Sequence, residues 1–239
     1  MKEQVKNFWL DRAKNTEVPR VESLVNFEND KQIADLRVET EISLINTELQ
    51  FNNDCTVVDL GAGNGRFTLF LAPNVKKVVA VEYISDFTDF IIEQAEKSRY
   101  TNIEVINMPA ENYCNENYAD IVFVSGLLNY LEPEQYNQTI KNISKTLKAE
   151  GTLFLRETIS ILDDEFIVNK YSDELEAHYC SLYRTKNQLI DDFHSQCFQP
   201  VKCFPFFSDG SVLNKRAETR LYCFIFTNSK KMLNNSAMK

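Results

Sequence analysis

The stretch that decides the fold is Val57–Phe67, which reads VVDLGAGNGRF. Its first residues form an apolar run typical of a buried strand, and its glycines are spaced as in a turn that opens a helix. A second apolar run, Val78–Glu82 (VVAVE), follows about one strand-and-helix unit later and ends on a carboxylate. This order of strand, glycine turn and acid-ended strand predicts an open parallel sheet that binds a nucleoside.

The order of the glycines indicates which kind of nucleoside. A dinucleotide fingerprint has glycines in the order G-x-G-x-x-G, and Arg66 stands where the third would be. The pattern here is instead Asp59 followed by glycines at positions 61, 63 and 65. Glycine adopts main-chain dihedrals closed to other residues and leaves room for a ligand to lie on the backbone. Because the charge of Asp59 repels a phosphate, the turn favours a ligand with cationic character.

With this motif the chain resembles the class I, Rossmann-like S-adenosylmethionine-dependent methyltransferases of the small-molecule type. The resemblance implies S-adenosylmethionine as cofactor and S-adenosylhomocysteine as product. It also implies that the turn lines the methionine and ribose parts of the cofactor, through Gly61, Ala62, Gly63 and Gly65. Asp59 would orient the amino group of the cofactor or the turn itself. Glu82 would bind both ribose hydroxyls, and Tyr83 would lie near the adenine.

Two later motifs extend the resemblance. Ile103–Glu111 resembles the third-strand motif, but Pro109 stands where an aspartate commonly meets the adenine. Adenine recognition is therefore expected from the backbone near Ala110, with Glu111 as a second candidate. Asp120–Tyr130 resembles the fourth motif, in which Ser125 and Gly126 would lie against the methionine part of the cofactor. It lacks the Asn-Pro-Pro-Tyr signature of enzymes that methylate base amines or protein glutamine.

The expected architecture is α/β: a three-layer, doubly wound, seven-stranded sheet, mostly parallel with a C-terminal antiparallel hairpin strand. The helix before the first strand, residues 30–49, has an apolar pattern through Val38, Ile42, Ile45 and Leu49. Farther on, Gly151 is expected to end a helix and the strand Thr152–Arg156 to follow it. The remaining expectations are an irregular or helical segment at 161–183, a helix at 186–196, and strands at 200–207 and 220–227 joined by a turn at 208–211.

The domain prediction is a single methyltransferase domain at residues 1–228. Within it, residues 1–50 form a helical lid and residues 157–184 a substrate-cap insert, and a disordered tail follows at 229–239. Trp9 in the lid either contacts the ligand or anchors the first helix on the sheet. Arg37 resembles an arginine that pairs with the methionine carboxylate in small-molecule N-methyltransferases. The alternative for Arg37 is an ion pair with Glu41, four residues farther along the same helix.

Candidates for the acceptor site lie near the carboxyl edge of the sheet. Glu157, after a strand, is placed to hold an amine or accept a proton, and His178 is a general base by its intrinsic pKa. In the fourth motif Asn129 would face the acceptor, with Tyr130 a further catalytic candidate.

A pair of residues in the cap also bears on the acceptor. Tyr183 and Arg184 would bind an acidic or phosphorylated acceptor. Alternatively, they only precede a helix that Thr185 caps.

Composition and charge narrow the partners. The chain has 239 residues, 44% of them hydrophobic, and a net charge of −9. Because affinity for nucleic acid rests on Lys and Arg, this charge argues against a nucleic-acid partner. The charged start of the chain and the absence of a long apolar run predict no membrane segment and a cytoplasmic location. The cysteine spacing predicts no metal site.

These observations predict methyl transfer to an oxygen or nitrogen of a small polar metabolite. A sugar, a nucleotide-sugar and a phosphorylated amine are the acceptors considered, with a monomer or homodimer as the assembly. A methyltransferase acting on protein N-termini is one alternative. A non-catalytic subunit that only binds S-adenosylmethionine is another.

Overall fold

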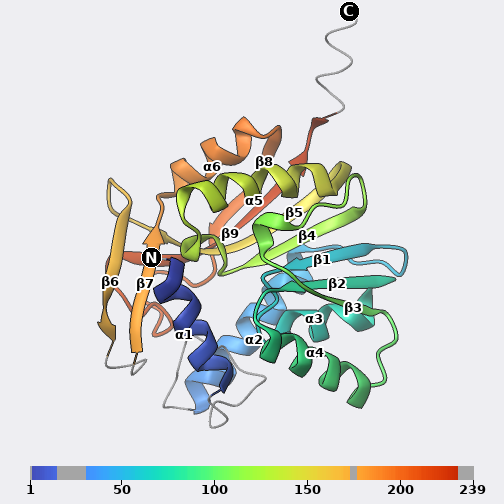
Figure 1. Ribbon diagram of the computed structural model, residues 1–239. Coiled ribbons are helices and arrows are strands. Elements are labelled where there is room, and N and C mark those ends of the chain that lie inside the picture. Colours follow the sequence, from blue (N-terminus) through green and yellow to red (C-terminus); the bar gives the residue numbers. More distant parts are fainter. Residues whose placement is uncertain (1, 15–30, 173–176, 231–239) are drawn as a thin grey trace, which may run out of the picture.

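The computed structural model describes residues 2–14, 31–172 and 177–230. Parts of the predicted lid, cap and tail fall on residues 1, 15–30, 173–176 and 231–239, which lie outside the described residues. Seven strands form one sheet in the order β3-β2-β1-β4-β5-β9-β8 (Figure 1). They are β1 (Thr56–Leu60), β2 (Lys77–Glu82), β3 (Ile103–Asn107), β4 (Ala119–Ser125), β5 (Leu147–Ser160), β8 (Phe198–Pro205) and β9 (Thr219–Asn228).

The sheet confirms the predicted fold class. Strands β1 to β5 pair in parallel, and β9 runs antiparallel to both β5 and β8. Helices cover both faces (Figure 1). They are α1 (Lys2–Lys14), α2 (Lys31–Glu48), α3 (Arg66–Leu71), α4 (Ser85–Lys97), α5 (Pro133–Thr146) and α6 (Lys186–Ser195).

Each face of the sheet has its own apolar core. Ile45 of α2 and Phe67 of α3 pack with Phe123 of β4 on one face. Ile140 of α5 and Phe193 of α6 pack on the other. The central strand β1 is buried on both sides after its first residue, as expected for a parallel strand between two helical layers. The two layers leave the carboxyl ends of the parallel strands as the place for a site.

Strand β5 differs from its predicted bounds at both ends. It begins at Leu147, directly after α5, and runs to Ser160. Near its start the register with β4 shifts, and Glu150 adopts a φ of 64°. Gly151 therefore lies in an irregular strand segment and not at a helix end. The far end is longer because β9 pairs with β5 as far as Ser160 opposite Thr219.

The segment predicted as irregular or helical forms a separate antiparallel pair of strands. β6 (Phe166–Ser172) pairs with β7 (Ala177–Tyr183), with Phe166 opposite Tyr183. Aromatic and β-branched residues are frequent in β6, and β7 has two tyrosines, which favours an extended conformation. The prediction missed this because the buried aromatics, Tyr179 and Tyr183, are four residues apart, a spacing that suits one face of a helix as well as one face of a strand. The pair lies beside α1 (Figure 1).

The connection between β8 and β9 is longer than the predicted turn. A turn is present at 208–211, where the N–H of Ser211 donates to the carbonyl oxygen of Ser208 at 3.1 Å. The chain then continues through residues 212–218 before β9 begins. We call residues 206–218 the closing loop. Among the described helices, none is both long enough and apolar enough to cross a membrane.

Candidate functional site

A cavity of about 460 Å³ lies at the carboxyl ends of the central strands, where sheets of this type bind their ligands. Its volume is within the ~300–1,000 Å³ typical of pockets for small molecules. The walls come from α1, α2, the turns after the strands, β7 and the closing loop. The predicted site residues that line it are Arg37, Asp59, Gly61, Ala62, Gly63, Glu82, Tyr83, Ala110, Glu111, Ser125, Gly126, Asn129, Tyr130, Glu157 and Tyr183.

The glycine turn after β1 forms part of the cavity wall. Gly61 and Gly63 have φ of 76° and 54°, a left-handed conformation that favours glycine. The N–H groups of Gly61 and Ala62 donate to the carbonyl oxygen of Val81 at 2.9 and 3.0 Å. These bonds fix the turn to the end of β2. The main chain of the turn is thereby presented to the cavity.

Gly65 does not line the cavity, contrary to its predicted place against the cofactor. Its φ is 77°, and a Cβ at this position would lie 2.6 Å from Cγ1 of Ile91 on α4. The residue is needed for the close packing of the start of α3 against α4. The sequence could not predict this difference, because the glycine motif is the same whether a glycine faces a ligand or packs against a distant helix.

Glu82 lies at the end of β2 and is 7% exposed. Its Oε2 accepts a hydrogen bond from the N–H of Gly63 at 2.9 Å, and its Oε1 accepts from the N–H groups of Tyr83 and Ile84 at 2.8 Å. Burial raises the pKa of the carboxyl. A carboxylate has about four lone-pair sites, and three of them are used, so Glu82 can still accept a hydrogen bond from a hydroxyl in the cavity.

Asp59, near the end of β1, accepts a hydrogen bond from the helix that follows the glycine turn. Its Oδ2 accepts a hydrogen bond from Oγ1 of Thr68 on α3 at 2.6 Å. Burial raises the pKa of this carboxyl to about 7. The bond favours the prediction that Asp59 orients the turn, and the side chain also lines the cavity.

The end of the cavity predicted for adenine has a carboxylate and amide pair. Oε1 of Glu111 accepts a hydrogen bond from Nε2 of Gln135 at 2.6 Å. Gln135 belongs to a capping box with Glu132 at the start of α5, which fixes its backbone. Gln135 lines the cavity and was not among the predicted site residues. Burial raises the pKa of Tyr83, close by, to about 12.

Helix α2 buries charged residues on the side that faces the sheet. Arg37, Glu41 and Ile45 are buried at four-residue spacing. The apolar pattern predicted that the buried face of α2 includes Val38 and Ile42, each one residue after a residue that is actually buried. Both Val38 and Ile42 are only half-buried. The prediction differs from the structure because an amphipathic pattern assigns burial to apolar residues in preference to charged ones.

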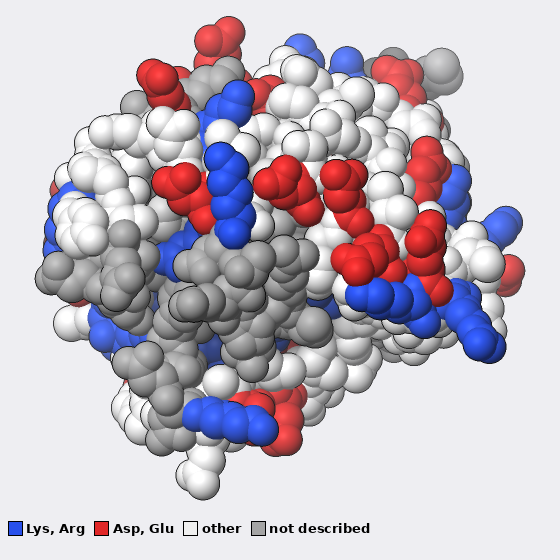
Figure 2. All heavy atoms as spheres, turned by 60° about the horizontal axis from the view of Figure 1, so that its bottom comes forward, with Lys and Arg blue, Asp and Glu red and all other residues white. Residues whose placement is uncertain are grey.

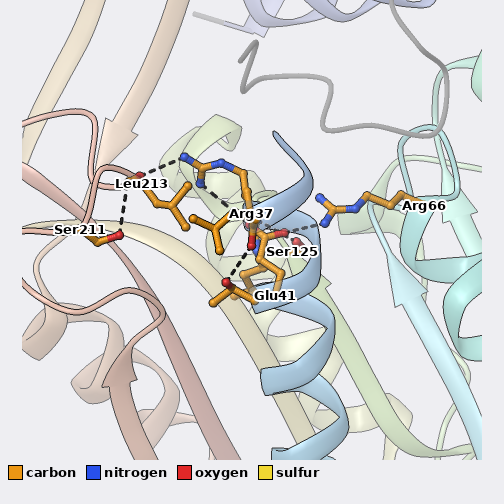
Figure 3. Close-up of polar contacts among 9 residues, drawn as sticks. Arg37, Glu41, Arg66, Ser125, Ser211 and Leu213 are labelled. Carbon is orange, nitrogen blue, oxygen red and sulfur yellow. Dashed lines mark hydrogen bonds and ion pairs between the residues drawn. The ribbon is translucent and has the colours of Figure 1, made fainter. Parts of the chain in front are cut away.

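Glu41 contacts arginines from three different elements. Two of them, Arg37 and Arg66, are labelled in Figure 3. Its Oε1 accepts from Nη2 of Arg156 at 2.5 Å, and its Oε2 accepts from Nη2 of Arg66 at 2.8 Å. Burial raises the pKa of Glu41, but the charges of Arg156, Arg66 and Arg37 outweigh burial and lower the pKa overall. We call these four residues the arginine cluster.

Arg37 makes the ion pair that was its alternative role, and its pairing with a methionine carboxylate stays a prediction. It lines the cavity, and its Nη1 lies 4.0 Å from Oε1 of Glu41. Its Nη2 donates to the carbonyl oxygen of Leu213 in the closing loop at 2.9 Å (Figure 3). Arg156 on β5 donates from Nη1 to Oγ of Ser125 at 3.2 Å, which joins the cluster to the turn after β4.

Four aromatic residues form a second wall, which we call the aromatic box: Trp9, Tyr130, Tyr179 and Tyr183. The rings of Trp9 and Tyr130 meet edge to face with centroids 5.1 Å apart. The hydroxyl of Tyr179 lies 3.1 Å from that of Tyr130 and 3.0 Å from that of Tyr183. Trp9 thus both anchors α1 and faces the cavity, so the two alternatives for this residue are compatible.

Glu157 lies between the aromatic box and the turn after β4. It is 1% exposed, and its Oε2 accepts from the N–H of Leu128 at 2.8 Å. Burial raises the pKa of its carboxyl to about 7. Asn129 is fixed nearby, because its Nδ2 donates to the carbonyl oxygen of Thr158 at 2.7 Å.

Two predicted acceptor residues do not line the cavity. Arg184 stacks on the ring of Tyr136 with its Cζ 3.6 Å from the centroid, and donates to the carbonyl oxygen of Leu128 at 3.0 Å. His178 is exposed on β7, where side chains alternate between two faces, so it points away from Tyr179. Thr185 caps α6, as the alternative for this segment predicted.

Basic residues from both ends of the chain also line the cavity and were not predicted: Lys6, Lys215 and Arg216. Nη1 of Arg216 lies 3.5 Å from the hydroxyl of Tyr183. The sequence signal for Lys215 and Arg216 was the run Asn214–Arg220, which has three cations and lies beyond the turn predicted at 208–211. Within the described parts of the chain, no group of three or more His, Cys, Asp or Glu residues is placed to bind a metal ion.

The comparisons with known proteins agree with this geometry. Residues 57–151 match a family model described as a methyltransferase domain. Over these residues the chain is similar to a methyltransferase domain, and its fold is that of S-adenosylmethionine-dependent methyltransferases of known structure. Phosphoethanolamine N-methyltransferase 1 of Triticum aestivum is 39% identical over 110 residues, which is 43% of this chain and 21% of that protein.

Two further comparisons cover more of the chain. A probable (S)-tetrahydroprotoberberine N-methyltransferase of Papaver bracteatum is 23% identical over 194 residues, 78% of this chain and 47% of that protein. The structure of phosphoethanolamine N-methyltransferase 1 of Haemonchus contortus with phosphoethanolamine and S-adenosylhomocysteine has a TM-score of 0.72 at 19% identity. It covers 94% of this chain and 48% of that one, and the likeness shows the fold. The matched segments span about a fifth to a half of these relatives.

The residues of the cavity fit S-adenosylmethionine, the cofactor of the methyltransferases whose fold the chain shares. Gly61 and Gly63 leave the main chain open beside Glu82, which can accept a hydrogen bond from a ribose hydroxyl. Nε of Arg156 is buried and has no hydrogen-bond partner among the described residues, so an anionic group would satisfy it. The turn therefore offers a place for a ribose, and the arginine cluster offers one for a carboxylate.

Proposed function

We propose that this methyltransferase transfers a methyl group from S-adenosylmethionine to the nitrogen of a small amine that also has a phosphate group. The observation that supports this most is the combination, in one cavity, of the aromatic box, Glu157, and the basic residues Lys6, Lys215 and Arg216. The aromatic rings and the carboxylate of Glu157 suit an amine, and the three basic side chains suit an anion.

The aromatic box favours an amine over a neutral hydroxyl acceptor. Ring faces attract an ammonium group by about 0.5–2 kcal/mol, more when the site is desolvated. The box offers several rings at centroid separations of 5.1 Å (Trp9 to Tyr130) and 6.1 Å (Tyr130 to Tyr179). A sugar or nucleotide-sugar has no cationic group to use this wall.

Glu157 is the group proposed to take the proton. The cofactor supplies a methyl group on a sulfonium, and the amine must present its lone pair to it. Because the pKa of Glu157 is about 7, its carboxylate can accept a proton from the bound ammonium near neutral pH. Burial raises the pKa of Tyr130 well above its usual value, so its hydroxyl stays protonated and orients the acceptor.

The basic residues are proposed to bind the phosphate. Arg216 reaches the edge of the box at Tyr183, and Lys215 is its neighbour in the closing loop. These cations stand out in a chain with a net charge of −9. On the face seen in Figure 2, the described Lys and Arg side chains are interspersed with Asp and Glu and form no continuous basic tract. Two of the relatives are named phosphoethanolamine N-methyltransferases.

The test is transfer of a labelled methyl group to matched acceptors. We expect phosphoethanolamine to be methylated with kcat/KM at least tenfold above that of ethanolamine, which has the same amine and no phosphate. A peptide with a free N-terminus and a sugar phosphate serve as further acceptors. Equal rates for the two amines would contradict the proposal that the site recognises a phosphate group on the acceptor. Transfer only to the peptide or the sugar, or no transfer at all, would favour the alternatives of protein methylation, oxygen methylation or a non-catalytic subunit.

A variant pair makes the test specific. Arg216→Gln is expected to raise KM for phosphoethanolamine about tenfold and to leave that for ethanolamine unchanged. Lys77→Gln removes the same charge from β2, where Lys77 pairs with Glu104, and should change neither constant.

A further inference from the structure

Arg184 lies where three elements that border the cavity meet. It follows directly after Tyr183, the last residue of β7. Its carbonyl oxygen accepts a hydrogen bond from the N–H of Ser160, the last residue of β5, at 2.8 Å. Its side-chain Nη1 donates to the carbonyl oxygen of Leu128, in the turn after β4, at 3.0 Å. One residue thereby joins the ends of β7 and β5 to the turn after β4.

The turn after β4 is held on both sides of Leu128, whose side chain is fully buried. The N–H of Leu128 donates to Oε2 of Glu157 at 2.8 Å, and its carbonyl oxygen accepts from Arg184. The bond from the guanidinium is charge-assisted, which makes it stronger than a bond between neutral groups. Leu128 begins a short 3₁₀ helix that ends at Tyr130. The two bonds therefore determine where the ring of Tyr130 lies.

The guanidinium of Arg184 is itself fixed by two helices. Its Cζ lies 3.6 Å from the ring centroid of Tyr136 on α5, and the hydroxyl of Tyr136 donates to Oδ2 of Asp192 on α6 at 2.7 Å. Burial and this hydrogen bond raise the pKa of Tyr136, so the hydroxyl keeps its proton. Arg184 is 5% exposed and does not line the cavity. It can therefore act on a ligand only through the residues that it holds.

The residues that Arg184 holds are those proposed to act on the acceptor. Glu157 lies on β5, three residues before Ser160, and Tyr179 lies on β7, five residues before Arg184. The hydroxyls of Tyr130 and Tyr179 lie 3.1 Å apart, so the turn and β7 must keep their places for this contact to form. Methyl transfer depends on such placement, because misplacing a reacting group by about 1 Å can cost about a hundredfold in rate.

We infer that Arg184 is a positioning residue for the acceptor end of the cavity, because it keeps Tyr130 and Glu157 in place beside the aromatic residues of β7. Its effect on methyl transfer rests on the proposed function, whereas its effect on the turn can be measured without any acceptor. Arginine suits this role because a planar guanidinium stacks on a ring and donates hydrogen bonds in its own plane at the same time. In place of the acceptor contact predicted from the sequence, Arg184 then has an indirect role.

Trp9 offers a direct measurement of the turn. It is the one tryptophan of the sequence, and its ring meets that of Tyr130 edge to face with centroids 5.1 Å apart. Because Arg184 holds the turn that contains Tyr130, a shift of the turn changes the surroundings of the indole. We expect the fluorescence maximum of Arg184→Met to move to longer wavelength, as water reaches the ring. Arg184→Lys retains a cation that can donate to Leu128, so its maximum should lie between those of the other two proteins.

The control is a substitution that destabilises the fold at the other end of β5. Nδ2 of the buried Asn228 donates to the carbonyl oxygens of Ser144 and Leu147 at 3.1 Å, and Leu147 begins β5. Asn228→Ala removes these bonds and should lower the urea midpoint about as much as Arg184→Met. It should leave the emission maximum and methyl transfer unchanged, because it does not contact the turn after β4.

Kinetics provide the second measurement, made on the whole chain at a temperature where each variant is folded. Neither Arg184 nor Asn228 lines the cavity, so calorimetry with S-adenosylmethionine should give dissociation constants within about twofold of wild type for all three variants. We expect kcat for labelled methyl transfer to phosphoethanolamine to fall about tenfold or more in Arg184→Met and about threefold in Arg184→Lys.

An emission maximum of Arg184→Met equal to that of the wild type would overturn the inference, as would equal losses of kcat in Arg184→Met and Asn228→Ala. If Arg184→Met does not fold, Arg184→Lys decides, because it keeps the charge and loses the planar stack on Tyr136. Wild-type emission and kcat in Arg184→Lys would then overturn the inference. A wild type that transfers no methyl group to phosphoethanolamine would overturn the proposed function, and the emission of Trp9 would still decide whether Arg184 holds the turn.

Discussion

Glu157 on β5 accepts a hydrogen bond from the N–H of Leu128, in the turn after β4, at 2.8 Å. The contact holds a buried carboxyl whose pKa is raised to about 7 from 4.5 by burial. In the native protein this group keeps its proton over a range in which the unfolded chain has lost it. The native state therefore loses stability from Glu157 as the pH rises from about 4.5 to about 7.

The substitution Glu157→Gln tests this shift. Gln keeps an acceptor for Leu128 and has no charge to bury. With about 1.4 kcal/mol for each pKa unit, we expect the variant to gain about 3 kcal/mol in free energy of unfolding at pH 8 and almost nothing at pH 4. Urea denaturation of both proteins at the two pH values measures the difference. A gain that is the same at pH 4 and pH 8 would contradict the raised pKa.

The parts of the site that sequence could predict are those built from neighbouring residues. Gly61, Gly63 and Glu82 follow apolar strands whose local pattern fixes their place at the edge of the sheet. The arginine cluster could not be found this way, because Glu41 meets Arg66 and Arg156 across 25 and 115 residues. Long-range ion pairs leave no periodic signal in the chain.

The alternation of side chains along β7 explains which residues of this strand line the cavity. Tyr179 and Tyr183 face the cavity because they are an even number of residues apart on β7, whereas His178 falls on the opposite face. The segment was predicted as irregular or helical, so this period of two was not applied to it. The aromatic box was therefore only partly predicted, through Trp9, Tyr130 and Tyr183.

Gly65 and Gly126 provide a matched pair of substitutions. Both have positive φ, 77° and 64°, so alanine strains the backbone at each. At Gly65 the new Cβ would also meet Ile91 at 2.6 Å, whereas at Gly126 nothing lies within 4 Å. We expect Gly65→Ala to lower the free energy of unfolding by about 3 kcal/mol and Gly126→Ala by about 1 kcal/mol. Denaturant midpoints measure both, and equal losses would show that Ile91 adapts freely.

Arg184 is expected to stabilise the fold and not to bind the acceptor. It is 5% exposed, stacks on Tyr136 and donates to Leu128. Arg184→Met keeps much of the side-chain volume but removes the hydrogen bond and the cation, so we expect a loss of about 2–3 kcal/mol in thermal or urea unfolding. His178→Ala on the exposed side of β7 should change stability by less than about 0.5 kcal/mol. A destabilised His178 variant beside an unaffected Arg184 variant would reverse these assignments.

Glu82→Gln tests the ribose contact while preserving most of the local structure. One oxygen of Gln can still accept from Tyr83 and Ile84, but an amide N–H₂ replaces the oxygen that accepts from Gly63. A ribose hydroxyl that needs an acceptor there would lose it. We expect both S-adenosylmethionine and S-adenosylhomocysteine to bind about 1–2 kcal/mol more weakly by calorimetry, because both have the same ribose. The control is Glu104→Gln, which removes the same charge at an exposed position of β3. Unchanged dissociation constants for both ligands would rule out the ribose role, and weaker binding of only one would place Glu82 near the sulfur instead.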